Sequence, residues 1–159
     1  MRHGTGKQIG LDNSAELARE EERISKKKAI ELFESGLLDT LQPGTFAALQ
    51  AIHKYLFEDI YDFAGQMRCD NIAKGNGRST RIWLDPLFKK ELGKVVDWSQ
   101  VDKEDYLLAM ERSPMRGIEI KHVLKAALID DTGSREVYMK GIDHSYYYEG
   151  YTSFKTEEL

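Results

Sequence analysis

The sequence predicts an all-α fold, with at most a small β-hairpin. Apolar residues recur at steps of three and four from Phe46 to Ile60, which is the spacing that lines one face of a helix. Capping residues stand before the predicted helices, and glycine or proline follows them. With 159 residues, of which 41% are hydrophobic and 31% charged, the chain has the size and composition of one globular domain.

The first helix is predicted over residues 14–35. Asn13 can cap it by accepting a backbone N–H bond, and Gly36 stands where a helix end often turns left-handed. Residues 1–13 contain several glycines and predict a flexible N-terminal arm. We therefore expect the folded domain to occupy residues 14–159.

The middle of this helix, residues 19–28, is almost entirely charged. Glu22 and Lys26 are four apart and can form an ion pair along the helix. We interpret the run as a solvated face, because that is what a dense mixture of charges usually indicates.

The remaining helices follow from the same signals. Thr45 is expected to cap a helix that ends at residue 65, and Asp102 is expected to cap one that ends near residue 112. Another helix begins near Ser79 and contains Pro86, which should kink it. The other predicted segments are an extended or irregular stretch over 66–74, a helix over 118–129, and two short helices over 135–140 and 142–149.

Composition argues against several classes of partner. The formal net charge is −4, so the chain as a whole does not attract nucleic acid or an anionic membrane. No stretch approaches the roughly 20 apolar residues of a membrane span. Cys69 is the single cysteine, which favours the reducing cytosol, and the first ten residues lack the apolar run of a signal peptide. We expect a cytoplasmic protein with no nucleic-acid or membrane partner.

Gly75, Asn76 and Gly77 open one predicted helix and predict an anion site. Small side chains let the backbone N–H groups approach an anion, and the helix N-terminus adds free N–H groups and a positive dipole end. Arg78 and Arg81 follow three apart, and their guanidinium groups could bind phosphate oxygens by forked bonds. The spacing is not that of a Walker loop, and the same residues also fit a plain turn.

Near the other end of the chain, Ser145 and Glu149 lie four apart on one helical face, followed by Gly150. Taken alone they fit an exposed polar pair beside an aromatic core. The four histidines have no second histidine or cysteine at metal-ligand spacing, so the sequence supports no metal site and no Cys-His or Ser-His-Asp grouping. His53 and His122 are interpreted as packed or surface residues on helices.

Several stretches together resemble the Fic family (filamentation induced by cAMP). Residues 52–65, IHKYLFEDIYDFAG, and residues 71–75, NIAKG, resemble the start of such a domain. Residues 76–85, NGRSTRIWLD, match the second half of its signature H-x-F-x-[DE]-G-N-G-R-x-x-R. Residues 141–151 resemble the subgroup with a C-terminal inhibitory helix, S-x-x-x-E-G. The resemblance implies a Fic-type helical bundle over residues 14–159, with residues 142–150 as the inhibitory helix.

The chain departs from the family between residues 74 and 77. Family members have several tens of residues here, which form a β-hairpin flap, a helix and the His-Pro-Phe of the signature. No histidine of this chain is followed by proline, so the catalytic histidine and the metal-binding acid of the signature are missing. Either a segment between 74 and 77 belongs to the protein and is omitted from this sequence, or it is truly deleted. We favour omission, because deleting a packed helix would leave a costly void.

The resemblance implies transfer of AMP from ATP, with Mg²⁺, to a Ser, Thr or Tyr hydroxyl of a target protein. Glu149 would pair with Arg81 and exclude the γ-phosphate, so the domain would be autoinhibited. Without the histidine, this chain is expected to be inactive. The residues implied in phosphate binding are Lys74, Gly75, Asn76, Gly77, Arg78 and Arg81, and those implied in inhibition are Ser145, Glu149 and Gly150.

Two other readings remain open at this stage. The chain could be a non-catalytic module that binds a nucleotide or a protein, or a related transferase that moves phosphate or another phospho-group. Autoinhibited members of the family can self-associate, so a homo-oligomer is a further partner to test.

Overall fold

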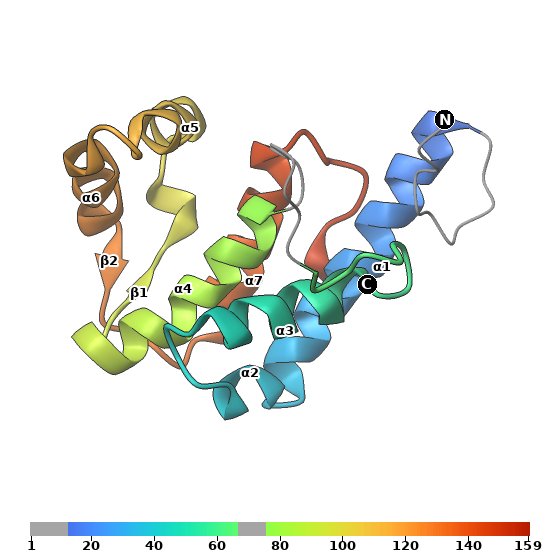
Figure 1. Ribbon diagram of the computed structural model, residues 1–159, viewed down its shortest axis with the longest axis horizontal. Coiled ribbons are helices and arrows are strands. Elements are labelled where there is room, and N and C mark those ends of the chain that lie inside the picture. Colours follow the sequence, from blue (N-terminus) through green and yellow to red (C-terminus); the bar gives the residue numbers. More distant parts are fainter. Residues whose placement is uncertain (1–12, 67–75) are drawn as a thin grey trace.

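The computed structural model describes residues 13–66 and 76–159, except for the side chain of Asn76, and these residues are mostly helical (Figure 1). The all-α prediction is confirmed. The helices are α1 (Ser14–Glu34), α2 (Leu37–Thr40), α3 (Phe46–Phe57), α4 (Asn76–Leu92), α5 (Lys103–Arg112), α6 (Gly117–Ala126) and α7 (Arg135–Tyr148), and the short elements are β1 (Val95–Val96), β2 (Leu128–Ile129), η1 (Trp98–Gln100) and η2 (Thr156–Glu158).

Helix α1 has the predicted bounds but not the predicted surface. The Asn13 side chain accepts a hydrogen bond from Ala15 N at 3.0 Å, and the helix ends before Gly36, whose φ is 74°. The charged middle is not a solvated face, because Glu21, Glu22 and Lys26 are 7%, 1% and 1% exposed. Each of these three side chains forms buried polar contacts with segments far along the chain.

Helices α1, α3, α4 and α7 pack together around the main core (Figure 1). Thr45 caps α3 as predicted, by accepting a hydrogen bond from Ala48 N at 3.1 Å. Helix α3 ends at Phe57, earlier than predicted, because the chain then turns through residues 58–65. The most buried members of this core are Ala29, Leu32, Leu38, Ile52, Leu56, Phe57, Ile60 and Tyr146.

Helix α4 begins at Asn76, three residues before the predicted start, and it contains Pro86 as predicted. The early start places Gly77 and Arg78 in the first turn of the helix and Arg81 in the next. The position of this helix end therefore decides how the predicted anion site is built.

Helices α5 and α6 form an arm that stands away from the four-helix body and is joined to it through β1 and β2 (Figure 1). The strands pair antiparallel, with Val95 opposite Ile129 and Val96 opposite Leu128. Because residues 128–129 pair in this way, α6 ends at Ala126 instead of continuing to 129. The two strands lie at the base of the arm, so they are not the β-hairpin flap, which is not seen among residues 13–66 and 76–159.

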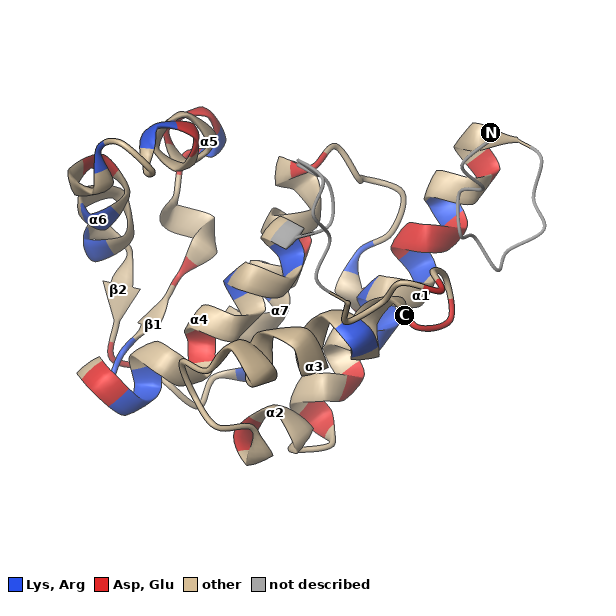
Figure 2. Ribbon diagram, in the orientation of Figure 1, with Lys and Arg blue, Asp and Glu red and all other residues tan. Residues whose placement is uncertain are grey.

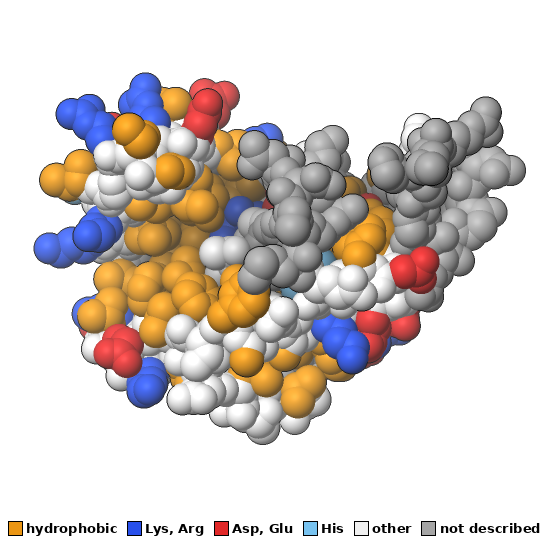
Figure 3. Space-filling model, viewed as in Figure 1, with side chains coloured by type: hydrophobic (Ala, Val, Ile, Leu, Met, Phe, Trp, Pro, Cys, Tyr) orange, Lys and Arg blue, Asp and Glu red, His pale blue; other side chains and the backbone are white. Residues whose placement is uncertain are grey.

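The face between the arm and α4 is lined by hydrophobic side chains (Figure 3). A second, smaller core lies beneath it and is centred on Trp98, Tyr106 and Tyr148. The Tyr148 hydroxyl donates to the carbonyl oxygens of Trp98 and Val101, both at 2.9 Å, and so fixes the end of α7 against η1.

Helix α7 is continuous, whereas the sequence predicted two short helices. Gly141 does not interrupt the helix. It provides space for the Trp98 ring, since a Cβ at Gly141 would lie 3.1 Å from Trp98 Cδ1. The segment predicted as an inhibitory helix, 142–150, is the second half of α7 followed by Glu149 and by Gly150, whose φ is 86°.

Candidate functional site

The candidate site lies at the N-terminus of α4, beside the end of α7. Figure 2 shows basic residues in the first turns of α4 next to this end of α7. The guanidinium groups of Arg78 and Arg81 both point into the protein, and these residues are only 2% and 4% exposed. Buried arginines need acceptors, and α7 and α1 supply them.

The carboxylate of Glu149 bridges the two arginines. Its Oε1 accepts a hydrogen bond from Arg81 Nη2 at 2.9 Å, and its Oε2 lies 2.8 Å from Arg78 Nε. Arg81 and Glu149, the two side chains whose pairing the family resemblance implied, are thus in direct contact. The additional contact with Arg78 was not predicted.

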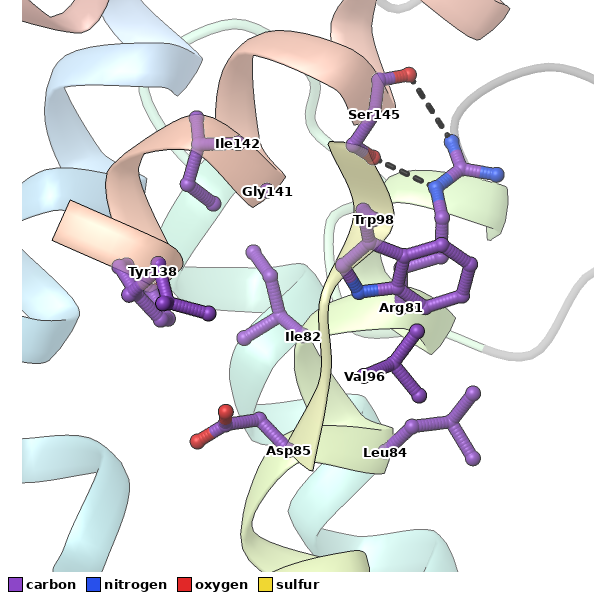
Figure 4. Close-up of a pocket in the computed structure, with 11 residues that line it drawn as sticks. Arg81, Ile82, Leu84, Asp85, Val96, Trp98, Tyr138, Gly141, Ile142 and Ser145 are labelled. Carbon is purple, nitrogen blue, oxygen red and sulfur yellow. Dashed lines mark hydrogen bonds between the residues drawn. The ribbon is translucent and has the colours of Figure 1, made fainter. Parts of the chain in front are cut away.

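Ser145 holds Arg81 from the preceding turn of α7. Its hydroxyl oxygen accepts from Arg81 Nε at 2.6 Å, and its carbonyl oxygen accepts from Arg81 Nη2 at 3.1 Å (Figure 4). Ser145 is 3% exposed, so the alternative of an exposed polar pair is wrong for this residue. The spacing Ser145-x-x-x-Glu149 therefore presents three acceptor atoms, from two residues, to one guanidinium group.

Arg78 sits in an aromatic cage. Its guanidinium carbon lies 4.8 Å, 5.1 Å and 4.8 Å from the ring centroids of Phe57, Tyr146 and Tyr151. Burial alone would lower the pKa of Arg78, but Tyr146, Glu149 and Glu21 outweigh it and raise that pKa above its ordinary value. The group is therefore charged, and face-on aromatic contacts of this kind stabilise a cation.

Glu21 is the functional candidate that the sequence analysis missed. Its Oε1 accepts a hydrogen bond from Arg78 Nη2 at 2.8 Å. It also accepts from the hydroxyl groups of Tyr61, at 2.5 Å, and Tyr151, at 3.1 Å. Burial, opposed by Arg78, raises the pKa of Tyr151 to about 12, so that hydroxyl remains a donor at neutral pH.

A signal for Glu21 was present in the sequence. Leu17, Glu21, Ser25 and Ala29 are spaced four apart, which places them on one face of α1, and all four are buried. A carboxylate on such a stripe predicts a buried cation opposite it. The surrounding run of charges concealed this pattern.

Part of Arg78 has no hydrogen-bond partner among the described residues. Its Nη1 is buried and makes no hydrogen bond to them, and its Nε, although close to Glu149, is not aligned for one. Buried donors without acceptors are rare in folded proteins and cost free energy. The site is thus short of acceptors in this state.

Gly77 forms the mouth of the site. A Cβ at this position would lie 2.8 Å from Glu149 Oε1 and 3.0 Å from Arg81 Nη1. The missing side chain therefore lets a carboxylate approach the first turn of α4, where free N–H groups and the helix dipole favour an anion. Glu149 places its carboxylate at this first turn.

A small cavity of about 30 Å³ lies behind the Arg81–Ser145 contact (Figure 4). Its lining is largely apolar and includes Val96, Trp98 and Ile142, together with Asp85. Burial raises the pKa of Asp85, against the opposing effect of Lys89 at 2.7 Å. A space of this size holds little more than water, so it does not accommodate a nucleotide base.

Several predicted site residues cannot be placed. Lys74 and Gly75 lie outside the described residues, as does the side chain of Asn76, so the choice between omission and deletion near residues 74–77 stays a prediction. His53 is packed as predicted, with its ring 4.9 Å from that of Phe57, and its Nδ1 accepts from Gly65 N at 2.9 Å. Across 13–66 and 76–159, no three His, Cys, Asp or Glu side chains gather as a metal site.

No protein-family model matches the chain. Of the helices in the described part, none is both long and apolar enough to cross a membrane.

Proposed function

We propose that this chain is a Fic-type nucleotide-binding domain that holds the phosphates of ATP at the N-terminus of α4, with Glu149 as a built-in competitor. The observation that carries the proposal is the bridge from Glu149 to both Arg78 and Arg81 across the open face of Gly77. A carboxylate in that position mimics a phosphate oxygen. Removing it would leave two buried guanidinium groups facing a helix N-terminus.

The proposed reaction of the complete protein is adenylylation. A Ser, Thr or Tyr hydroxyl oxygen of a target protein forms a bond to the α-phosphorus of ATP, the bond from that phosphorus to the bridging oxygen breaks, and pyrophosphate leaves. The hydroxyl proton passes to a general base, which is the signature histidine in the resembling family. This chain has no His-Pro, so we propose that it binds ATP without transferring AMP.

The residues present contribute binding and orientation. Arg78 and Arg81 supply forked donors for phosphate oxygens and neutralise their charge. Mg²⁺ is not supported in the same way, because the carboxylates of Glu21 and Glu149 are committed to arginines and the described residues form no acidic cluster. We therefore assign no step to the metal.

The free energy with which Glu149 competes against ATP follows from the strength of its bonds to the arginines. A hydrogen bond to a charged group contributes about 1.5–3 kcal/mol, which corresponds to roughly ten- to a hundredfold in an equilibrium constant. Displacing Glu149 therefore weakens ATP binding by about that factor, which is enough for a regulatory switch.

Isothermal titration of ATP into the wild type and Glu149→Gly tests this proposal. We expect the variant to bind ATP about ten- to a hundredfold more tightly, since it lacks the competing carboxylate. Glu157→Gly is the matched control, because it removes an exposed carboxylate near the same terminus, and it should bind as the wild type does. Equal affinities for all three proteins would contradict competition by Glu149.

Transfer is tested with the gene product that includes any segment between residues 74 and 77. Labelled ATP should modify a target protein or the domain itself, and Glu149→Gly should increase the rate. Mass spectrometry separates an added AMP from an added phosphate. ATP binding without any transfer by that protein would instead support the non-catalytic binding module.

A further inference from the structure

We propose that Glu21 is the positioning residue for Arg78: it fixes the guanidinium group so that Nη1 and Nε remain available to an anion after Glu149 has left. The inference rests on the proposed phosphate site and adds a second acid to it. Glu21 lies on α1, whereas Glu149 follows α7, so the two carboxylates can separate.

Glu21 is held more firmly than Glu149. It lies within a 21-residue helix, and the hydroxyl group of Tyr61, which is outside α7, donates to it at 2.5 Å. Glu149 is the C-cap of α7 and has a more exposed side chain, and within residues 13–66 and 76–159 its carboxylate pairs with the two arginines alone. When the end of α7 moves, Glu21 therefore keeps its contact with Arg78 while Glu149 loses its contacts.

The aromatic cage alone does not orient Arg78. Ring faces attract the cation from several sides, but they do not distinguish one guanidinium nitrogen from another. The 2.8 Å bond from Nη2 to Glu21 makes that distinction, and it leaves Nη1 without an acceptor among the described residues. The position of Glu21 thus determines that Nη1 is the Arg78 nitrogen left without an acceptor among the described residues.

The charge balance of the site also assigns different roles to Glu21 and Glu149. Glu21 and Glu149 together balance Arg78 and Arg81, so the closed site is neutral. Loss of Glu149 leaves one uncompensated positive charge, and Glu21 continues to neutralise Arg78 in part. Affinity for phosphate then depends on Arg81 for charge and on Arg78 for correctly directed donors.

Glu21→Gln in the Glu149→Gly background tests whether Glu21 positions Arg78 or only repels the phosphate groups of ATP. If Glu21 only repels phosphate, the Gln variant binds ATP more tightly. If Glu21 positions Arg78, ATP binding weakens, by about tenfold, because a charge-assisted bond is replaced by a neutral one of roughly half the strength. Isothermal titration gives the sign, and unchanged or tighter binding overturns the proposal.

A second readout does not need nucleotide. In Glu149→Gly, restricted rotation of the Arg78 guanidinium should give separate Nη resonances in nitrogen-15 NMR at low temperature, and Glu21→Gln should merge them. If Arg78 remains restricted without the Glu21 charge, the positioning role is wrong. Absence of ATP binding in every variant would contradict the proposed function, while the NMR result would still decide the role of Glu21.

Tyr61→Phe is a milder variant in case Glu21→Gln does not fold. It removes the 2.5 Å hydrogen bond to Glu21 and leaves Arg78 and its aromatic cage in place. We expect a smaller loss of ATP affinity in the same direction and partial broadening of the Arg78 signals. Tyr55→Phe, which removes a 3.3 Å bond to Glu31 instead, should change neither.

Discussion

Two neighbouring acids on α1, Glu21 and Glu22, enter two different buried clusters. Glu21 faces Arg78 and, beyond it, Arg81 and Glu149. Glu22 faces the end of the chain, where it is grouped with Lys26 and Asp143. Both acids are buried and both are ion-paired, so burial of charge does not by itself distinguish the candidate site.

The Glu22 cluster is saturated. The carboxylate of Glu22 accepts from the backbone N–H groups of Ser153 and Phe154, both at 3.0 Å. Lys26 Nζ lies 2.8 Å from Asp143 and also donates to the carbonyl oxygen of Phe154. Asp143 in turn accepts from the backbone and hydroxyl groups of Thr156, both at 3.0 Å. The cluster fastens the C-terminal tail to α1 and α7, and its function is structural.

The Glu21 cluster is unsaturated. Arg78 Nη1 is buried with no acceptor among the described residues, and the cluster opens onto the missing side chain of Gly77. Unused donors, rather than buried charge, therefore distinguish the candidate site from the Glu22 cluster. A saturated cluster can only lose contacts, whereas an unsaturated one can gain a ligand.

The largest expected effect is a loss of unfolding free energy when the saturated Glu22 cluster is broken. Lys26→Met leaves Glu22 and Asp143 without their buried cation, and breaking such a pair typically costs about 3–5 kcal/mol. Urea denaturation of the variant should show that loss of unfolding free energy. Lys28→Met is the control on the same helix. Lys28 forms ion pairs with the more exposed Glu58 and Asp59 and lies over the Tyr55 ring, so the change should cost no more than about 1 kcal/mol.

A smaller effect is expected at the mouth of the unsaturated cluster. Gly77→Ala places a methyl group where Glu149 or a phosphate must approach, so in the Glu149→Gly background it should lower ATP affinity by about tenfold. The unfolding free energy should change by less than about 1 kcal/mol, because the helix preference of alanine is offset by the 3.0 Å approach of its Cβ to Arg81 Nη1. Gly117→Ala, at a helix start with nothing within 4 Å, is the matched control. Unchanged ATP affinity in Gly77→Ala would move the site away from α4.

A further effect is the dependence of the unfolding free energy on alkaline pH. Burial, opposed by Arg78, raises the pKa of Tyr146 and of Tyr151 to about 12, above the ordinary tyrosine value near 10. The unfolded chain therefore loses these protons first, so the contribution of the two tyrosines to the unfolding free energy is constant below about pH 10 and declines from there towards pH 12. Urea titrations at pH 8 and 11 measure the decline. Tyr151→Phe should reduce it, and a decline of wild-type size in that variant would contradict this origin.

The helices of this fold were largely predictable, because their signals are local. Asn13, Thr45 and Asp102 cap their helices through bonds to residues two or three positions ahead. The predictions were wrong where contacts with residues distant in the sequence determine the course or the end of a helix. Helix α7 passes through Gly141 because Trp98 packs against it, and α6 ends early because its next residues pair with β1.

The candidate site was predictable only in part for the same reason. The spacing of Gly77, Arg78 and Arg81 predicted an anion site, with a plain turn as the alternative, and the anion site stays a prediction. Their pairing with Glu149, 68 residues beyond Arg81, was expected only through the family resemblance, since spacing cannot show it. Glu21 lies 57 residues before Arg78, and its role depends on the packing of α1 against the site.

The most direct test of the account compares one acid from each cluster. Inorganic pyrophosphate is titrated calorimetrically into the wild type and into two variants, Glu149→Gln and Asp143→Asn. Each variant changes one carboxylate, on or beside α7, that pairs with a buried cation. We predict that Glu149→Gln binds pyrophosphate about ten- to a hundredfold more tightly than the wild type, and that Asp143→Asn does not differ from it. Equal affinities in Glu149→Gln and the wild type, or an equal gain in both variants, would contradict the claim that Glu149 competes for a phosphate site.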